Sequence, residues 1–326
     1  MAQQAGDAGA IIYDVPENNP PIKGPGDYAK ISPTAILVAG LRARYTDLPY
    51  AHEIYRAVRL LTNNTLTMGT GAVSSRLARF APYTMNRVAF IESRYLSVNQ
   101  ILKNLGSEYA VIEVAAGLSA RGLEWAGSES LYIETDLPEM LSTKQKVFDR
   151  VLLETGLRQR RNHHFCPLNA LDINDWDRIG RQFFGEGKTK IAVVHEGLAS
   201  YLSLTEKEKL RDNIAAFLGK YASTGEWITP DFYPYENSQR TWLSRMIQNR
   251  LEQKTQVKMH HFGDAKEVLQ FLSEGGFQAS SRDYSFIMSE VSCIAKVPLD
   301  RETVRRALSR YRVYLAQYTG QRESRA

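Results

Sequence analysis

The fold is determined by the stretch Val111-Ile112-Glu113-Val114-Ala115-Ala116-Gly117-Leu118-Ser119-Ala120-Arg121-Gly122. It begins with apolar, β-branched residues typical of a strand, passes through small residues, and continues from Leu118 to Trp125 with the pattern of a helix. A strand that turns directly into a helix brings backbone N–H groups and a helix N-terminus to one point. The stretch therefore predicts a turn that a ligand approaches closely.

A carboxylate follows this turn at an informative distance. Leu131–Asp136 has the pattern of the next strand, and Asp136 lies nineteen positions after Gly117. Nucleoside-binding α/β units place the residue that accepts the ribose hydroxyls about 20 positions after the turn. Plain packing is the alternative, because Ala115 and Ala120 stand where a dinucleotide fingerprint has glycines. Asp136 favours a nucleoside ligand, and we expect its carboxylate, at a strand end, to lie outside the core.

Composition and charge narrow the class of protein. The chain has 326 residues, 43% hydrophobic and 24% charged, as in ordinary soluble globular proteins. Its net charge of +5 is spread along the chain, so we expect no nucleic-acid partner. We also expect no membrane partner and a cytoplasmic location, because no apolar run approaches about 18 residues and no basic-then-apolar leader is present. The sequence leaves the oligomeric state open, including a homodimer.

We expect no metal site. Cys166 and Cys293 are far apart and lack metal-ligand spacing, so they are predicted to be buried free thiols. The histidines at 163–164 and 260–261 are adjacent pairs rather than sets spaced as ligands.

The chain divides into three predicted parts. Residues 1–30 are rich in Gly, Pro, Asn and Gln and predict a mobile arm. Residues 31–106 predict a helical cap, and residues 107–326 predict an α/β domain in which strands alternate with helices, which implies a mostly parallel seven-stranded sheet. The cap helices are expected from Ser32 and near 50–61, 72–80 and 85–105. The strands are expected at 109–114, 130–135, 162–165, 189–195 and 226–229, then as an antiparallel hairpin over 277–281 and 286–295. Further helices are expected at 138–155, 206–221, 238–254, 264–274 and 301–318.

Polar residues follow four successive predicted strands. Glu113 ends the first, Asp136 the second, Asp172 lies beyond the third, and His195-Glu196 closes the fourth. Because ligands of open α/β sheets bind at the carboxyl ends of the strands, these residues predict a site. For Asp172 a helix cap ahead of Trp176 is the alternative.

These residues resemble the leucine carboxyl methyltransferase family, which includes polyketide-pathway O-methyltransferases. The resemblance rests on Pro33-Thr34-Ala35, the helix containing Arg94, Val111–Gly117, Ile133–Glu139, and His195-Glu196-Gly197 with Tyr201. It runs from about residue 33 to residue 220, with a looser match in the tail. It implies the Rossmann-like class I methyltransferase fold and the cofactor S-adenosyl-L-methionine.

The resemblance also implies a role for each matching residue. The turn of Glu113, Ala115 and Gly117 would contact the cofactor, although Ala115 stands where the family has its first glycine. Asp136 would accept both ribose hydroxyls, and Leu171 and Asp172 would hold the adenine. Arg94 would face the methionine carboxylate, Glu196 the methionine ammonium, and Tyr201 the acceptor.

We therefore expect an O-methyltransferase acting on a carboxylate or phenolic hydroxyl of a small molecule or peptide. A sulfonium methyl donor requires binding and alignment rather than a metal. A carboxylate acceptor needs no base, whereas a phenol or alcohol would benefit from one, for which His195 is the nearest candidate. A structural hydrogen bond is the alternative role of His195. An NAD-dependent oxidoreductase and a catalytically inactive cofactor-binding scaffold are the alternative functions. The former would not account for Arg94 or Glu196.

Overall fold

The computed structural model describes residues 32–62, 82–125, 130–158, 161–185, 189–232, 253, 260–296 and 300–321. The predicted arm over 1–30 and the helix near 72–80 lie outside these residues, as does the helix predicted over 238–254 except for residue 253. None of the described helices is both long and apolar enough to span a bilayer.

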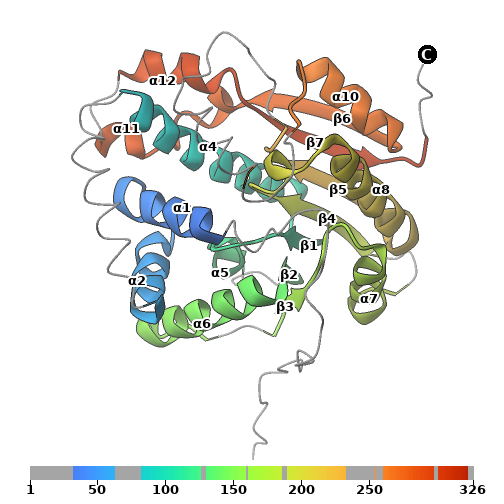
Figure 1. Cartoon of the computed structure of the whole chain (residues 1–326), viewed down its shortest axis with the longest axis horizontal. Helices are drawn as coiled ribbons and strands as arrows, with labels where there is room; N and C mark the ends of the chain where they lie inside the picture. Colours follow the sequence, from blue (N-terminus) through green and yellow to red (C-terminus); the bar gives the residue numbers. More distant parts are fainter. Residues whose placement is uncertain are drawn as a thin grey trace, which may run out of the picture.

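The centre of the molecule is a seven-stranded sheet with the strand order β3-β2-β1-β4-β5-β7-β6. β1 to β5 pair in parallel, and β7 runs antiparallel to both β5 and β6 (Figure 1). The predicted α/β class, with a Rossmann-like, mostly parallel seven-stranded sheet, is confirmed. The strands are β1 (Tyr109–Val114), β2 (Tyr132–Asp136), β3 (His163–Pro167), β4 (Thr189–His195), β5 (Ala222–Thr229), β6 (Phe277–Asp283) and β7 (Arg312–Tyr318).

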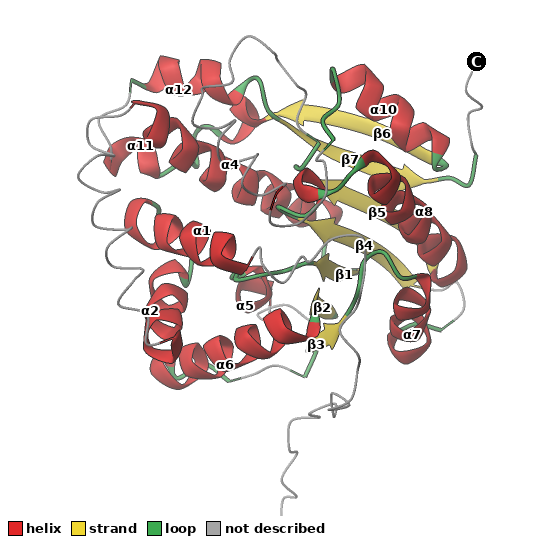
Figure 2. Cartoon of the chain, in the orientation of Figure 1, coloured by secondary structure: helices red, strands yellow, loops and turns green. Residues whose placement is uncertain are grey.

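Helices cover both faces of this sheet (Figure 2). α7 (Ile173–Phe183), α8 (Leu204–Tyr221) and α10 (Ala265–Glu274) lie on one face, and α4 (Pro82–Leu105), α11 (Cys293–Lys296) and α12 (Arg301–Leu308) on the other. Successive residues of a strand point to opposite faces, so Val111 packs with the α4 side and Ile112 with the α8 side. The central strands are accordingly apolar without alternation, as parallel strands covered on both faces are.

The first two helices attach beside the sheet. α1 (Ser32–Tyr45) and α2 (Ala51–Thr62) share a core with α5 (Arg121–Trp125) and α6 (Pro138–Thr155). The helices predicted from Ser32, near 50–61, over 85–105 and over 138–155 are thus confirmed. α4 belongs to the sheet core itself, since Val88 and Val98 pack with Val111 and Val194.

The tail differs from the prediction. Residues 286–295 do not form the second strand of a hairpin: the 3₁₀ turn η4 (Tyr284–Ile287) and α11 occupy this region. The predicted helix over 301–318 ends at Leu308, and its last part is β7. The reason is visible in β7, where Val313 faces the α4 core and Tyr314 the α8 core, so that the segment fills the place between β5 and β6.

A buried carboxylate docks this tail onto α4. Glu92 is 1% exposed and accepts hydrogen bonds from the backbone N–H groups of Ser292 and Cys293, each at 2.9 Å. It also accepts from the Ser292 hydroxyl. Ser292 directly precedes α11, and the N–H of Cys293, its first residue, has no partner within the helix. The side chain of Glu92 therefore fixes the C-terminal segment to the helix that precedes the sheet.

We predict that Glu92→Ala lowers the free energy of unfolding by about 1–3 kcal/mol, because it leaves buried N–H groups without acceptors. Urea unfolding followed by circular dichroism measures this loss. Glu290→Ala is the control, since Glu290 is exposed and its removal should stay within about 0.5 kcal/mol of wild type. Equal stability of the two variants would contradict the docking role.

Candidate functional site

A cavity of about 410 Å³ opens at the carboxyl ends of β1 to β4. This volume lies within the range of roughly 300–1,000 Å³ typical of small-molecule sites. Its walls come from the turn after β1, the ends of β2 and β3, the 3₁₀ turn η2 (Ala199–Tyr201) after β4, and helices α1, α4 and α6. Of the predicted site residues, the lining includes Arg94, Glu113, Ala115, Gly117, Asp136, Leu171, Glu196 and Tyr201. Asp172 and His195 are outside it.

The turn after β1 has the tight conformation that its small residues predict. Ala115 and Gly117 both have left-handed backbone angles, with φ of 52° and 49°. The turn is fastened to β2 by a 2.9 Å hydrogen bond from the N–H of Ala116 to the carbonyl of Thr135. Above it lies α1, because a Cβ on Gly117 would be 3.7 Å from the Ala35 Cβ. Ala115 thus keeps the conformation of the glycine it replaces, at a cost of about 1–2 kcal/mol.

Asp136 lies at the edge of the cavity with its carboxylate fixed. Its Oδ2 accepts from the Gly117 N–H and its Oδ1 from the Leu137 N–H, both at 2.8 Å. Burial raises the pKa of this carboxyl, although the two N–H groups oppose the shift. The expectation that Asp136 lies outside the core is wrong, because it is 9% exposed and holds the turn in place.

Leu171 lines the cavity, whereas Asp172 caps a helix. The Asp172 Oδ1 accepts from the N–H and from the side-chain amide of Asn174, both at 3.0 Å. The geometry therefore supports the helix cap, which was the alternative interpretation, and the adenine contact of Asp172 stays a prediction.

Glu196 is the centre of the charged part of the site. Its Oε1 accepts from Arg42 and, at 3.0 Å, from Nε of Arg94, and its Oε2 accepts from Nη2 of Arg121 at 2.8 Å. Burial, the largest single effect, raises the pKa of this carboxyl, but the three guanidinium groups together lower it to about 2. Glu196 is therefore ionised at any physiological pH. We call Arg42, Arg94 and Arg121 the arginine cluster.

Arg121 joins this cluster to the end of β1. It is fully buried, and it donates from Nε to the Asn99 Oδ1 at 2.6 Å and from Nη1 to Glu113. Glu113 also accepts from the Tyr132 hydroxyl at 2.7 Å and is 1% exposed. The Glu113 carboxylate therefore bonds to the protein interior, while Glu113 also lines the cavity, and its cofactor contact stays a prediction.

Arg42 and Arg121 were not among the predicted site residues. Arg42 lies seven positions after Ala35, on the same face of α1, and this helical spacing was a usable signal. Arg121 begins α5, directly after the turn. Both guanidinium groups lie over the ring of Tyr95, 4.6 Å and 4.5 Å from its centroid.

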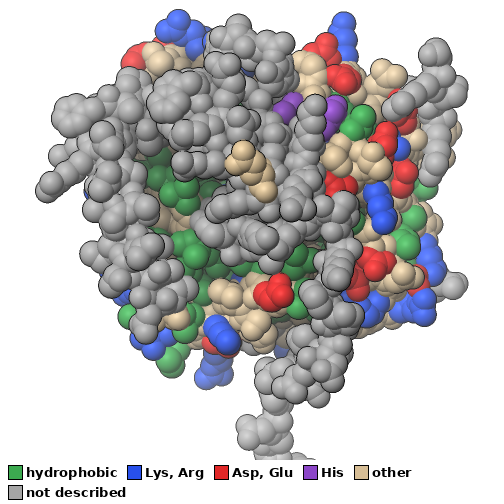
Figure 3. All heavy atoms as spheres, in the orientation of Figure 1, with side chains coloured by type: hydrophobic (Ala, Val, Ile, Leu, Met, Phe, Trp, Pro, Cys, Tyr) green, Lys and Arg blue, Asp and Glu red, His purple; other side chains and the backbone are tan. Residues whose placement is uncertain are grey.

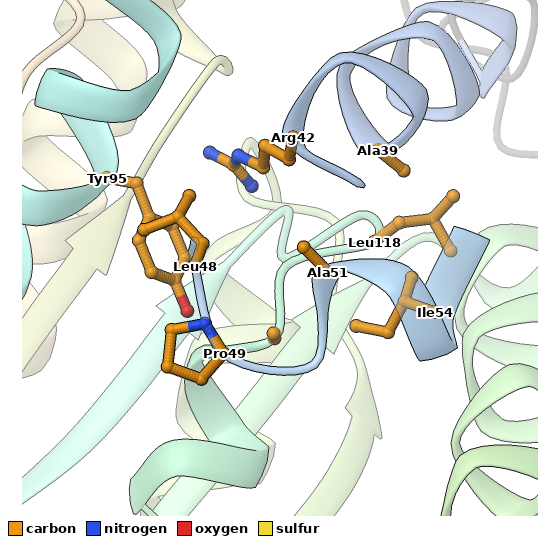
Figure 4. A pocket seen from close by; sticks show the side chains of 9 residues that line it. Ala39, Arg42, Leu48, Pro49, Ala51, Ile54, Tyr95 and Leu118 are labelled. Carbon is orange, nitrogen blue, oxygen red and sulfur yellow. The ribbon is translucent and has the colours of Figure 1, made fainter. Parts of the chain in front are cut away.

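A second, much smaller cavity of about 10 Å³ adjoins Arg42, enough for one water molecule at most (Figure 4). The figure shows the Arg42 guanidinium projecting on the side of Tyr95, with alkyl side chains around the remaining space. Its other lining residues are Ala39, Leu48, Pro49, Ala51, Ile54, Leu118 and Ala120. Arg42 therefore separates this apolar gap from the large cavity.

His195 lies away from the cavity. It is fully buried, and its Nδ1 is 2.9 Å from the Oδ2 of Asp231. Asp231 in turn accepts from the N–H groups of Gly197, Leu198 and Ala199 at 2.7–3.1 Å. The pair holds the loop after β4, so the geometry supports the structural role of His195 and not the predicted catalytic role.

Tyr201, at the end of η2, does line the cavity beside Glu196. Within the described part of the chain, no group of three or more His, Cys, Asp or Glu side chains could hold a metal ion. On the face in Figure 3, the described Lys and Arg side chains are interspersed with Asp and Glu.

The profile of the leucine carboxyl methyltransferase family matches residues 35–215. The chain belongs to this family. The match begins on α1 at the cavity wall and extends through Glu196 into α8, so it contains every residue of the arginine cluster.

The chain is also similar to curated proteins of mycobacteria. A protein of Mycobacterium marinum is 25% identical over 267 residues, which cover 78% of this chain and 85% of the relative. One from Mycobacterium sp. strain JLS is 25% identical over 272 residues with the same coverage. Both are named as candidate S-adenosyl-L-methionine-dependent methyltransferases.

Similar solved structures include the magnesium protoporphyrin IX methyltransferase of Synechocystis with bound S-adenosylhomocysteine. Its TM-score is 0.43 and its identity 12%, and the match covers 73% of this chain and 88% of the other. An O-methyltransferase family protein of Burkholderia thailandensis has a TM-score of 0.43 and 14% identity. The match covers 83% of this chain and 72% of the other.

We predict that Ala115→Gly leaves the free energy of unfolding unchanged or raises it by up to about 1.5 kcal/mol. The left-handed angle favours glycine by about 1–2 kcal/mol, and the greater chain entropy of glycine offsets about 0.5–1 kcal/mol of this gain. Ala116→Gly is the matched control, because Ala116 has no positive φ and should lose about 1 kcal/mol. Urea unfolding compares the two, and equal losses would show that no strain is stored at Ala115.

Proposed function

We propose that this protein binds S-adenosylmethionine in the large cavity and transfers its methyl group to an oxygen atom of an acidic acceptor. The observation that carries the proposal is the arrangement of Asp136 at one side of the cavity and Glu196 with the arginine cluster at another. A nucleoside joined to an amino-acid zwitterion requires groups of this kind. The family membership and the names of the relatives support the same cofactor.

The residues present fit the cofactor. Each Asp136 oxygen already accepts one N–H and keeps a second lone pair for a ribose hydroxyl. Leu171 offers an apolar contact for the adenine. Arg94 would bind the methionine carboxylate, and Glu196 the ammonium group. When bound, the cofactor supplies an electrophilic methyl group on a sulfonium, and the protein holds it and the acceptor in line.

The methyl donor itself favours an anionic acceptor, because the sulfonium is a cation that attracts a carboxylate or an ionised phenol. The cavity lining does not add a positive excess, since Arg42 and Arg94 face the carboxylates of Glu113, Asp136, Glu139 and Glu196. A carboxylate is already ionised at neutral pH and needs no base, which agrees with the burial of His195. Tyr201 lines the cavity and would contact the acceptor.

We predict that Asp136→Ala weakens S-adenosylhomocysteine binding by about 1–3 kcal/mol, the range for a hydrogen bond to a charged group. Calorimetric titration measures the Kd, and urea unfolding should show a loss of stability as well, because Asp136 also holds the turn. Asp264→Ala is the control: Asp264 caps α10 and does not line the cavity, so its loss should cost about 1 kcal/mol of stability and leave the Kd unchanged. A folded Asp136→Ala protein with wild-type affinity would refute the ribose contact, and NAD binding by the wild type would favour the oxidoreductase.

We predict that His195→Gln changes the rate of methyl transfer less than about threefold in folded protein. A positioned base typically contributes about 10²–10⁴-fold, and the contact of His195 with buried Asp231 supports a structural role instead. The assay compares carboxylate and phenol acceptors between pH 6 and 8. A hundredfold loss with a flattened pH profile would make His195 a general base, and no turnover with any acceptor would favour a cofactor-binding scaffold.

A further inference from the structure

We propose that Arg121 is a positioning residue for the cofactor, which keeps Glu196 ionised and in place when the other two arginines engage the bound cofactor. The inference rests on the proposed function, specifically on the contact between Glu196 and the methionine ammonium. Arg121 would act on the cofactor through Glu196, without contacting the cofactor itself.

The three arginines approach Glu196 from different sides. Arg42 and Arg94 line the cavity and share the Oε1 of Glu196. Arg121 is fully buried, does not line the cavity, and donates to Oε2. A cofactor can therefore draw Arg42 and Arg94 toward its carboxylate while the bond between Arg121 and Oε2 stays intact.

Arg121 is itself held rigidly. Its three nitrogens donate to Asn99 on α4, Glu113 at the end of β1, and Glu196 after β4. A guanidinium is planar, with its donors in a fixed fork, so these three acceptors determine its orientation. A lysine at this position could supply the positive charge, but it could not donate hydrogen bonds to all three acceptors in this fixed geometry.

The charge of Arg121 matters most when the cofactor is bound. A buried carboxylate without a counter-charge becomes protonated, and protonated Glu196 could not balance an ammonium group. Once Arg42 and Arg94 bind the cofactor carboxylate, Arg121 remains as the protein's own counter-charge of Glu196, beside the ammonium group of the ligand. Glu196 itself is paired with Arg42 on α1, Arg94 on α4 and Arg121 on α5. The charged and titratable groups that face these arginines are Tyr95, with its partner Glu124, Glu113 on β1, and Asp231, with its partner His195.

The test is calorimetric titration with S-adenosylhomocysteine between pH 5.5 and 8.5. For Arg121→Gln we expect a Kd at least tenfold above wild type at pH 7.5, rising further as the pH falls. The Kd is expected to rise at low pH because the loss of a guanidinium raises the pKa of Glu196. Protonation of Glu196 then removes the partner of the ammonium group. We expect Arg121→Lys to restore the wild-type dependence on pH and part of the affinity. An Arg121→Gln profile parallel to wild type would overturn the proposal.

A double variant separates positioning from mere charge balance. If Arg121 served only to neutralise Glu113, then Arg121→Gln combined with Glu113→Gln would restore the wild-type Kd, and the proposal would fail. We expect the double variant to remain weak and dependent on pH. It also keeps the test possible if Arg121→Gln alone does not fold, because it leaves no unpaired Glu113.

Arg211→Gln is the matched control for burial. Arg211 is 8% exposed, lies on α8, and donates to the carbonyl of Phe271 at 2.9 Å, so its loss should lower stability and leave the Kd unchanged. Glu196→Gln distinguishes the two proposals. If it binds like wild type, the ammonium contact of the proposed function is wrong; if it binds weakly while Arg121→Gln does not, only the role of Arg121 is wrong.

Discussion

The structure depends on a carboxylate that is buried among three guanidinium groups. Removing an ionised carboxylate from water costs several kcal/mol even after the protein relaxes, and Glu196 offsets that cost with Arg42, Arg94 and Arg121. These arginines come from α1, α4 and α5, three helices that are separate in sequence. A charge at the end of one strand thus fixes the position of three helices, and the cavity forms between them.

This arrangement explains why the site was only partly predictable. Asp136 and Glu196 follow strands, and the alternation of strands and helices places them at one edge of the sheet, so local patterns suffice to find them. The partners of Glu196 are 154, 102 and 75 positions away. In the sequence, Arg42 and Arg121 look like ordinary solvent-exposed helix residues. Only the tertiary structure shows that both are buried. The sequence also could not show that the Glu113 carboxylate pairs with buried groups, or that His195 holds the loop after β4, because both roles depend on tertiary contacts.

The fold, like the site, was predictable only in part from the sequence. Apolar periodicity identified the parallel strands and most helices within a few residues, because buried strands and amphipathic helices leave strong local signals. It failed for β7, since Arg312–Tyr318 contains helix-compatible residues and becomes a strand only because β5 and β6 leave a place between them. It also left Asp172 open between a ligand contact and a helix cap, and the bonds to Asn174 that support the cap are visible only in the folded structure.

The docking of the tail by Glu92 has a consequence for the order of events during synthesis. Glu92 and Arg94 lie two positions apart on α4, so the helix that supplies a cavity arginine is also the one to which the C-terminal segment is fastened. Lys296 adds a second attachment, to the Thr46 carbonyl at the end of α1, the helix that carries Arg42. The described residues that line the cavity therefore emerge from the ribosome before the segment that locks their helices. Completion of the pocket is a late event of translation.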